Sequence, residues 1–242
     1  MIQQRKTIRK KDIVANFESN SGANSSASSG VNSGAGSSAV ASKAFDVNRL
    51  AIPFAKAFLF TVLISAATMA GALPIPGTPV PVTLQTLVLA LAGLTLTWRQ
   101  AVSSVLMYLA IGAAGMPVFA GGKSGVVAFA GPSVGFLVGF VFGVAAIALV
   151  KSALEGVVNA AMPEDSVAKK FARFGAYFAA SVVGSLVIYA FGFVGQSLMM
   201  HLPVLAIAVA STGFIVGDII KAAIASAACA GLYGAFKRNT NA

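Results

Sequence analysis

Long runs of apolar residues, separated by short polar or glycine- and proline-containing breaks, fill the chain from about residue 50 onward. A helix of about 20 apolar residues matches the hydrocarbon thickness of a bilayer. The pattern therefore predicts an all-α integral membrane protein with six transmembrane helices. The expected helices are Leu50–Leu73, Val82–Trp98, Gln100–Gly115, Ser133–Leu154, Phe174–Met200 and Val204–Phe236.

Two of the breaks have a distinctive composition. Four prolines within Pro74–Pro81 exclude a regular helix there, and Met116–Pro132 reads as a glycine-rich loop. Glycines then recur every four residues along the start of the fourth expected helix, which predicts close packing against another helix. They are Gly131, Gly135, Gly139 and Gly143.

The first 44 residues differ from the rest of the chain. Basic residues at the start are followed by a tract, residues 19–42, made almost throughout of Ser, Gly, Asn and Ala. Such a tract buries too little apolar area to fold, and no apolar run follows the basic residues as in a signal peptide. We expect residues 1–44 to be a disordered cytoplasmic tail and residues 45–242 to form the six-helix membrane domain.

Composition narrows the function. The chain is 57% hydrophobic and only 10% charged, whereas soluble domains average about 25% charged residues. A single His and a single Cys leave no His/Cys metal cluster, so no metal site is expected. No nucleophile–base set stands out, and only one acid, Asp218, lies inside an apolar run, so we do not expect an enzyme. The net charge of +10 fits cytoplasmic loop charge better than nucleic-acid binding.

The positions of the basic residues predict the topology. All but two of the 17 lysines and arginines lie in the tail or near helix ends that six spans would place on one side. The positive-inside rule then puts both termini in the cytoplasm. The proline-rich segment, the glycine-rich loop and the turn at His201 would face outward. The two exceptions, Lys123 and Lys221, point to an outward-facing site for a ligand with an acidic group.

Asp218 and Lys221 form the clearest candidate pair. They stand three residues apart in the last apolar run, so they share one helix face. A charge inside a bilayer costs at least about 2.5–3.5 kcal/mol, which makes an intramembrane ionisable residue a candidate for function. The alternative is a structural pair whose members only neutralise each other.

One stretch of the glycine-rich loop imitates a nucleotide-binding motif. Gly121-Gly122-Lys123-Ser124 resembles the end of a phosphate-binding loop, but Pro117 stands where that motif requires its first glycine. We do not expect ATP to bind there.

Several motifs in order resemble the BioY family, the biotin-specific substrate-binding subunits of energy-coupling factor transporters. They cover Val80–Thr86, Tyr108–Gly122, Gly131–Phe140 and Gly217–Lys221. The resemblance extends over roughly Leu50–Phe236. Two positions depart from it: Phe136 stands where many members have Tyr, and Lys123 lies in a loop that is often glycine there.

The resemblance implies a multi-pass protein of a prokaryotic cell membrane that captures biotin from the outer side. Import would be driven by an energy-coupling transmembrane subunit and two separate ATPase subunits. Biotin would be a transported ligand rather than a cofactor. Two alternatives remain: a substrate-binding subunit for another small anionic vitamin, and a membrane assembly protein that transports nothing.

Biotin offers ureido N–H donors, a ureido carbonyl and a carboxylate. We expect Asp218 to accept from the N–H groups and Gln85 to donate or accept at the same ring. Residues at i and i+3 lie only about 5–6 Å apart, shorter than biotin from ring to carboxylate. Either Lys221 stretches along the ligand, or Lys123 binds the carboxylate while Lys221 supports Asp218. We favour a role for both lysines.

Four further residues complete the expected site and its surroundings. Tyr108 and Phe119 are candidate apolar walls of the pocket, although ordinary packing explains them equally well. Ala66 and Ala70 form a small-residue face on the first expected helix, suited to close contact with the coupling subunit.

Overall fold

The computed structural model describes residues 47–71, 80–163 and 166–240. The predicted tail over residues 1–44 and most of the proline-rich segment lie outside the described residues. The described part is helical, with one isolated antiparallel bridge between Phe119 and Lys123. Its helices are α2 (Val47–Met69), α3 (Gln85–Thr95), α4 (Trp98–Ala113), η1 (Val126–Ala130), α5 (Val134–Ala161), α6 (Val167–Met200), α7 (Val204–Ala210) and α8 (Thr212–Thr240).

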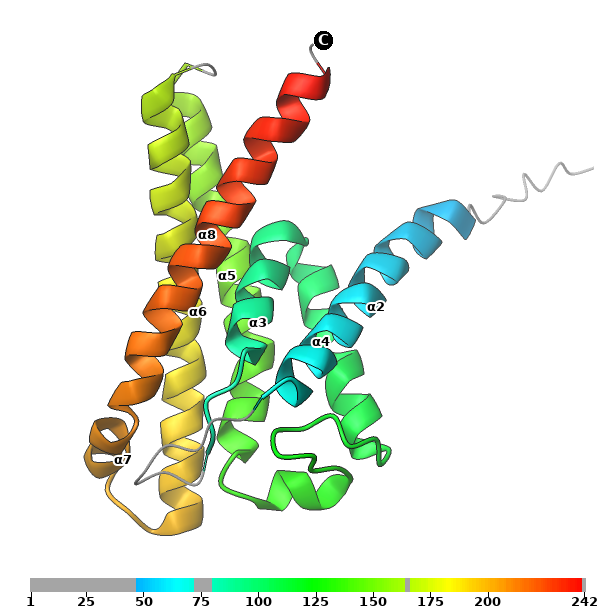
Figure 1. Ribbon diagram of the computed structural model, residues 1–242, viewed down its shortest axis with the longest axis vertical. Coiled ribbons are helices and arrows are strands. Elements are labelled where there is room, and N and C mark those ends of the chain that lie inside the picture. The colour runs from blue at the N-terminus through cyan, green and yellow to red at the C-terminus, as the bar shows by residue number, and fades with distance from the viewer. Residues whose placement is uncertain (1–46, 72–79, 164–165, 241–242) are drawn as a thin grey trace, which may run out of the picture. The chain divides into compact units, whose positions relative to one another are not determined.

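Figure 1 shows the long helices as a bundle with its irregular segments gathered mainly at one end. That end holds residues 80–84, 114–133 and 201–203, and we call it the loop end. The start of α2, the α3–α4 and α5–α6 connections and the last turns of α8 lie toward the opposite end. Three segments far apart in the sequence therefore lie toward the same end of the bundle.

Four described helices are long and apolar enough to cross a membrane: Ala51–Met69, Val134–Ala161, Val167–Met200 and Thr212–Gly231. The remaining two expected spans correspond to α3, with 11 residues, and α4, with 16 residues. The all-helical membrane architecture is thus confirmed, whereas helix length alone supports four of the six predicted spans.

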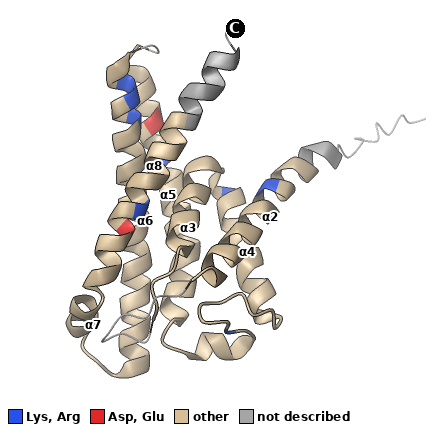
Figure 2. Cartoon of the chain, viewed as in Figure 1, with Lys and Arg blue, Asp and Glu red and all other residues tan. Residues whose placement is uncertain are grey.

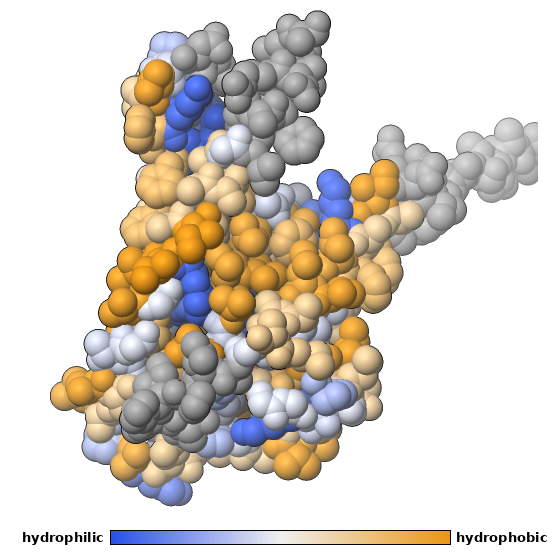
Figure 3. All heavy atoms as spheres, viewed as in Figure 1, coloured by the Kyte–Doolittle hydropathy of each residue, from blue (hydrophilic) through white to orange (hydrophobic). Residues whose placement is uncertain are grey.

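The surface agrees with a membrane environment. Large apolar side chains stay exposed along the long helices, for example Leu59 at 56% and Leu186 at 61%. Apolar residues predominate along the middle of the face shown in Figure 3. Figure 2 shows most of the coloured Lys and Arg residues toward the end opposite the loop end.

Helices α5 and α6 are longer than predicted. The charged stretch expected to connect them mostly continues both helices, so that Glu155 and Arg173 are helical. Ser166 caps the start of α6, because its side chain accepts a hydrogen bond from the backbone N–H of Ala168 at 3.2 Å. The polar connection shrinks to residues 162–166.

The last predicted helix, Val204–Phe236, is broken in the structure. Ser211 separates α7 from α8 with backbone angles of φ −92° and ψ 8°. The hydroxyl of Thr212 donates to the carbonyl of Val209 at 2.6 Å, and a side chain bonded this way competes with the regular helical pattern. The break turns the chain at the loop end and starts the helix that carries Asp218.

Glycines hold α5 against α6, as their spacing predicted. A Cβ atom added to Gly135 would lie 2.3 Å from the carbonyl oxygen of Phe191, and one added to Gly139 would lie 3.0 Å from that of Ile188. At Gly143 it would lie 2.4 Å from the Ile188 side chain, whereas at Gly131, before the helix, it would make only ordinary contact. This packing fixes the α5–α6 pair that forms one wall of the candidate site.

Candidate functional site

A cavity of about 390 Å³ lies between the helices toward the loop end. Residues of α3, α4, α5, α6 and α8 line it, together with the segments at 80–84 and 119–133. All six residues predicted to bind the ligand lie around this single cavity. They are Gln85, Tyr108, Phe119, Lys123, Asp218 and Lys221.

Asp218 is the hub of a buried hydrogen-bond network. One carboxylate oxygen, Oδ1, accepts from the Thr86 hydroxyl at 2.7 Å and from Lys221 Nζ at 3.0 Å. The other, Oδ2, accepts from the Tyr189 hydroxyl at 2.6 Å. The partners come from α3, α8 and α6, so this carboxylate joins three helices.

Lys221 is equally well coordinated. Besides Asp218, its ammonium donates to the backbone carbonyl of Thr83 at 2.6 Å and to the Thr86 hydroxyl at 3.0 Å. The two charged side chains are only 12% and 6% exposed. A buried ion pair offsets its desolvation only when hydrogen bonds satisfy its remaining groups, and this pair has them. All three ammonium hydrogens of Lys221 have acceptors inside the protein.

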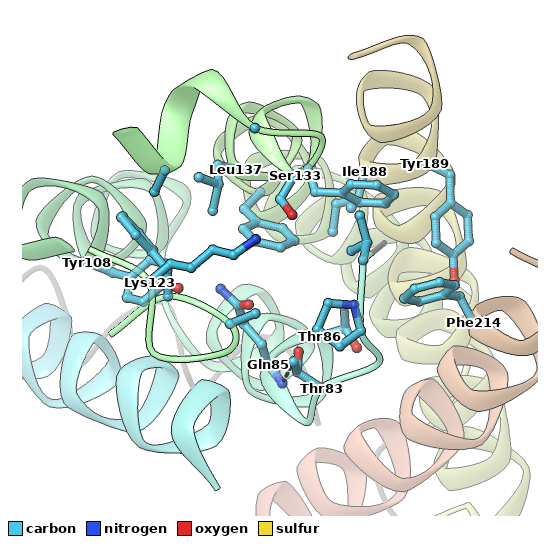
Figure 4. A pocket seen from close by; sticks show the side chains of 18 of the residues that line it. Thr83, Gln85, Thr86, Tyr108, Lys123, Ser133, Leu137, Ile188, Tyr189 and Phe214 are labelled. Carbon is cyan, nitrogen blue, oxygen red and sulfur yellow. Dashed lines mark hydrogen bonds between the residues drawn. The ribbon is translucent and has the colours of Figure 1, made fainter. Parts of the chain in front are cut away.

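Lys123 reaches the cavity from the glycine-rich loop. The backbone N–H of Phe119 donates to the carbonyl of Lys123 at 3.1 Å, closing a tight turn. Gly121 and Gly122 occupy the left-handed region there, with φ of 75° and 72°, which favours glycine. Figure 4 shows the Lys123 side chain extending into the cavity. Among the described residues, Lys123 forms no ion pair with a carboxylate.

Tyr108 and Phe119 form an aromatic side of the cavity. Their rings meet edge to face, with centroids 5.4 Å apart, and the Tyr108 hydroxyl donates to the carbonyl of Val118 at 3.3 Å. A Cβ atom at Gly112 would lie 2.2 Å from the Phe119 ring, so this glycine makes room for it. Both aromatic residues are buried, at 0% and 3% exposure.

Gln85 is the first residue of α3 and lines the same cavity. It is only 3% exposed, and although its side chain interacts with the neighbouring Tyr108, its amide nitrogen Nε2 makes no well-formed hydrogen bond among the described residues. Buried polar groups nearly always have a partner, so each exception requires an explanation. A ligand acceptor in the cavity would provide one.

Thr86, Tyr189 and Phe214 belong to the site but did not stand out in the sequence. Thr86 lies within a family-like motif, whereas Tyr189 and Phe214 are aromatic residues in apolar runs and read as ordinary packing. Their roles depend on which helices pack together. Only a contact between α6 and α8 brings the Tyr189 hydroxyl to Asp218.

Ala66 and Ala70, predicted as a partner contact, lie away from the cavity. Both are exposed, and Ala70 directly follows α2, with its backbone N–H donating to the carbonyl of Ala66 at 2.8 Å. They therefore present a small-residue patch on the outer side of the bundle.

Comparisons with known proteins agree on one family. A profile of the BioY family matches residues 40–238. The chain is 32% identical to the biotin transporter BioY of Rhizobium etli over 69% of this chain and 86% of that protein. It is 34% identical to the biotin transporter BioY of Thermotoga maritima over 71% and 89%, respectively.

A solved structure shares the fold. The crystal structure of the S-component for biotin from an ECF-type ABC transporter superposes with a TM-score of 0.66. The match covers 77% of this chain and 93% of that one at 23% sequence identity. At that identity the likeness supports the fold.

Proposed function

This chain belongs to the BioY family, and from that membership we propose that it is the biotin-binding subunit of an energy-coupling factor transporter in a prokaryotic cell membrane. Two features of the site support the proposal. The cavity volume of about 390 Å³ falls within the range of small-molecule pockets, about 300–1,000 Å³. Its polar groups also form two sets, one centred on a carboxylate and one on a lysine.

The arrangement of these sets carries the proposal. Asp218, beside Tyr189 and Thr86, offers an acceptor for the ureido N–H groups of biotin. Lys123 offers a cation for the biotin carboxylate, and Gln85 Nε2 offers a donor for the ureido carbonyl. Lys221 already has three acceptors within the protein, so its role is to support Asp218. This favours Lys123 as the residue that binds the carboxylate.

We further propose that α3 and α4 complete six membrane crossings with both termini in the cytoplasm. At 1.5 Å per residue these helices are about 16 and 24 Å long, less than a bilayer core of about 30 Å. Irregular backbone is tolerated at membrane depth where it lines a cavity, as residues 80–84 and 119–133 do here. These two loops would complete the short crossings on the outer side.

The exposed patch at Ala66 and Ala70 is our candidate contact with the energy-coupling transmembrane subunit, which would work with two ATPase subunits. Small side chains let two helices approach closely inside a membrane. No described residue of this patch lines the cavity, so the contact and the ligand site are separable.

Uptake of labelled biotin tests the proposal in cells that lack their own biotin transporter and express this chain with the coupling and ATPase subunits. We expect ATP-dependent uptake of biotin. Ala70→Trp should abolish uptake while leaving biotin binding intact. Met69→Trp is the matched control, because it adds a ring at an exposed position about 100° further round the helix.

Three results would contradict parts of this proposal. Uptake at the normal rate in Ala70→Trp would exclude this patch as the contact. Preferential uptake of another anionic vitamin would reassign the ligand. Absence of uptake and binding for every vitamin tested would favour a membrane assembly protein.

A further inference from the structure

Three cavity residues form one stripe along α8. Phe214, Asp218 and Lys221 stand at i, i+4 and i+7, positions that face the same side of a helix, and all three line the cavity. Phe214 and Asp218 are 8% and 6% exposed. A ligand group that reaches the Asp218 carboxylate therefore lies against or beside the Phe214 ring, one helical turn away.

The Asp218 carboxylate has unused hydrogen-bonding capacity. Oδ1 accepts from both Thr86 and Lys221, which matches its two lone pairs. Oδ2 accepts from Tyr189 alone among the described residues, so it has room for one more donor. Figure 4 shows the Tyr189 side chain reaching toward the Phe214 ring. A ligand N–H that binds Oδ2 would lie beside Tyr189, and Phe214 lines the same cavity one helical turn from Asp218.

The Phe214 ring is held by other aromatic residues. It stacks on Phe136 with centroids 6.4 Å apart and an interplanar angle of 21°. Phe136 meets Phe193 edge to face at 6.0 Å, and Phe193 stacks on Tyr189 at 5.3 Å. We call Phe136, Tyr189, Phe193 and Phe214 the α8 aromatic wall. Its rings come from α5, α6 and α8, and three of them, Phe136, Tyr189 and Phe214, line the cavity with Asp218.

A second aromatic group lies beside Lys123. Phe119 meets both Tyr108 and Phe129 edge to face, at 5.4 and 5.6 Å. The backbone bridge between Phe119 and Lys123 holds this aromatic group next to the residue that carries the positive charge. The cavity thus has two aromatic surfaces. One, the α8 aromatic wall, lies beside the Asp218 carboxylate, and the other, around Phe119, lies beside the Lys123 ammonium group.

We propose that Phe214 is a specificity-determining residue that packs against the sulfur-containing ring of the ligand. This inference rests on the proposed function, since it takes biotin as the ligand. The ureido ring of biotin is fused to its thioether ring, so binding of the ureido group at Asp218 places the sulfur ring at the α8 aromatic wall. Aromatic faces and edges attract a thioether sulfur at about 5 Å. The acidic chain then runs past Phe119 toward Lys123.

Desthiobiotin provides the test, because it keeps the ureido ring and the acidic chain but lacks the sulfur-containing ring. The full chain is purified in detergent, and the affinities for biotin and desthiobiotin are measured for wild type and Phe214→Leu. We expect Phe214→Leu to weaken biotin about three- to tenfold and desthiobiotin less than twofold. The preference for biotin over desthiobiotin should fall accordingly.

Phe119→Leu is the matched control, since it makes the same exchange at the other aromatic group. It should weaken both ligands by the same factor and leave the preference unchanged. Phe214→Met repeats the test with a flexible apolar side chain should the leucine variant not fold, and the same fall in preference is expected.

The inference is overturned if the Phe214 variants weaken both ligands equally or if Phe119→Leu alone changes the preference. Either result would leave biotin binding by the wild type, and therefore the proposed function, intact. Failure of wild-type protein to bind either ligand would instead contradict the proposed function itself.

Discussion

Two carboxylates in this protein have nearly the same partners and very different surroundings. Asp218 on α8 accepts from Tyr189 and pairs with Lys221 on its own helix at 3.0 Å. Glu155 on α5 accepts from Tyr177 and lies 4.0 Å from Lys151 on its own helix. In both cases the tyrosine belongs to α6.

The surroundings separate the two networks. The Asp218 side chain is 6% exposed, has a third partner on α3 and borders the cavity. The Glu155 side chain is 24% exposed, lies in the far half of α5 and does not line that cavity. Carboxylate, tyrosine and lysine alone therefore do not identify a binding site. Asp218 differs from Glu155 in bordering the cavity with an oxygen that has room for a further donor.

The largest expected contrast concerns the two lysines of these networks. Lys221→Met leaves the buried Asp218 carboxylate without its cation and should lower the free energy of unfolding by about 3–5 kcal/mol. Lys151→Met breaks a longer, more exposed pair and should cost at most about 1 kcal/mol. Cys229, the only cysteine and a buried one, lets a thiol-reactive fluorophore report thermal unfolding of both variants. Equal decreases in the free energy of unfolding would show that the Asp218–Lys221 pair stabilises the protein no more than the Glu155–Lys151 pair does.

The second contrast concerns the carboxylates themselves. Asp218→Asn keeps the shape but removes the charge and replaces an acceptor with a donor. Loss of a charged hydrogen bond of about 1.5–3 kcal/mol should weaken biotin roughly 10- to 150-fold. Glu155→Gln is the matched exchange and should leave the affinity unchanged. Near-wild-type affinity in a folded Asp218→Asn protein would remove Asp218 from the site.

Lys123 extends the comparison to a lysine that forms no ion pair with a carboxylate among the described residues. Lys123→Ala should weaken biotin about tenfold, as for a single charge-assisted contact, but leave a biotin amide almost unaffected. The measurement is a pair of dissociation constants for each protein. If Lys123→Ala preserves the difference between biotin and its amide, Lys123 does not bind the carboxylate.

The smallest expected effect concerns Gln85, and its sign is informative. Gln85→Leu removes a buried amide nitrogen that makes no well-formed hydrogen bond among the described residues, so the ligand-free protein should be as stable as wild type or slightly more stable. Biotin should bind about 2- to 12-fold more weakly, because a neutral hydrogen bond of about 0.5–1.5 kcal/mol is lost. Loss of stability without loss of affinity would indicate a structural role for Gln85.

Much of this architecture was predictable from the sequence. Apolar runs located the helices, although α3 and α4 are shorter than a bilayer span and α5 and α6 extend beyond the predicted bounds. The ordered motifs indicated the family that the comparisons confirm. Asp218, Lys221 and Lys123 stood out because a charge is unusual in an apolar run, as is a basic residue in a loop expected to face outward. The break at Ser211 was missed because the apolar run continues across it and no proline marks it.

The rest of the site could not be read from the chain. Tyr189 and Tyr177 look alike in sequence, each within an apolar stretch of the same helix. Tyr189 belongs to the site only because α6 packs against α8 at the level of Asp218. Lys221 likewise donates hydrogen bonds to Thr83 and Thr86 only because the start of α3 packs against α8. The spacing of residues in the sequence does not predict that contact.

Calorimetric titration of the purified full chain with biotin and a panel of small anionic vitamins tests the central claim most directly. We predict binding of one biotin per chain, with every other vitamin bound more weakly or not at all. Tighter binding of a different vitamin, or no binding of biotin by folded protein, would contradict the claim that this cavity is a biotin site.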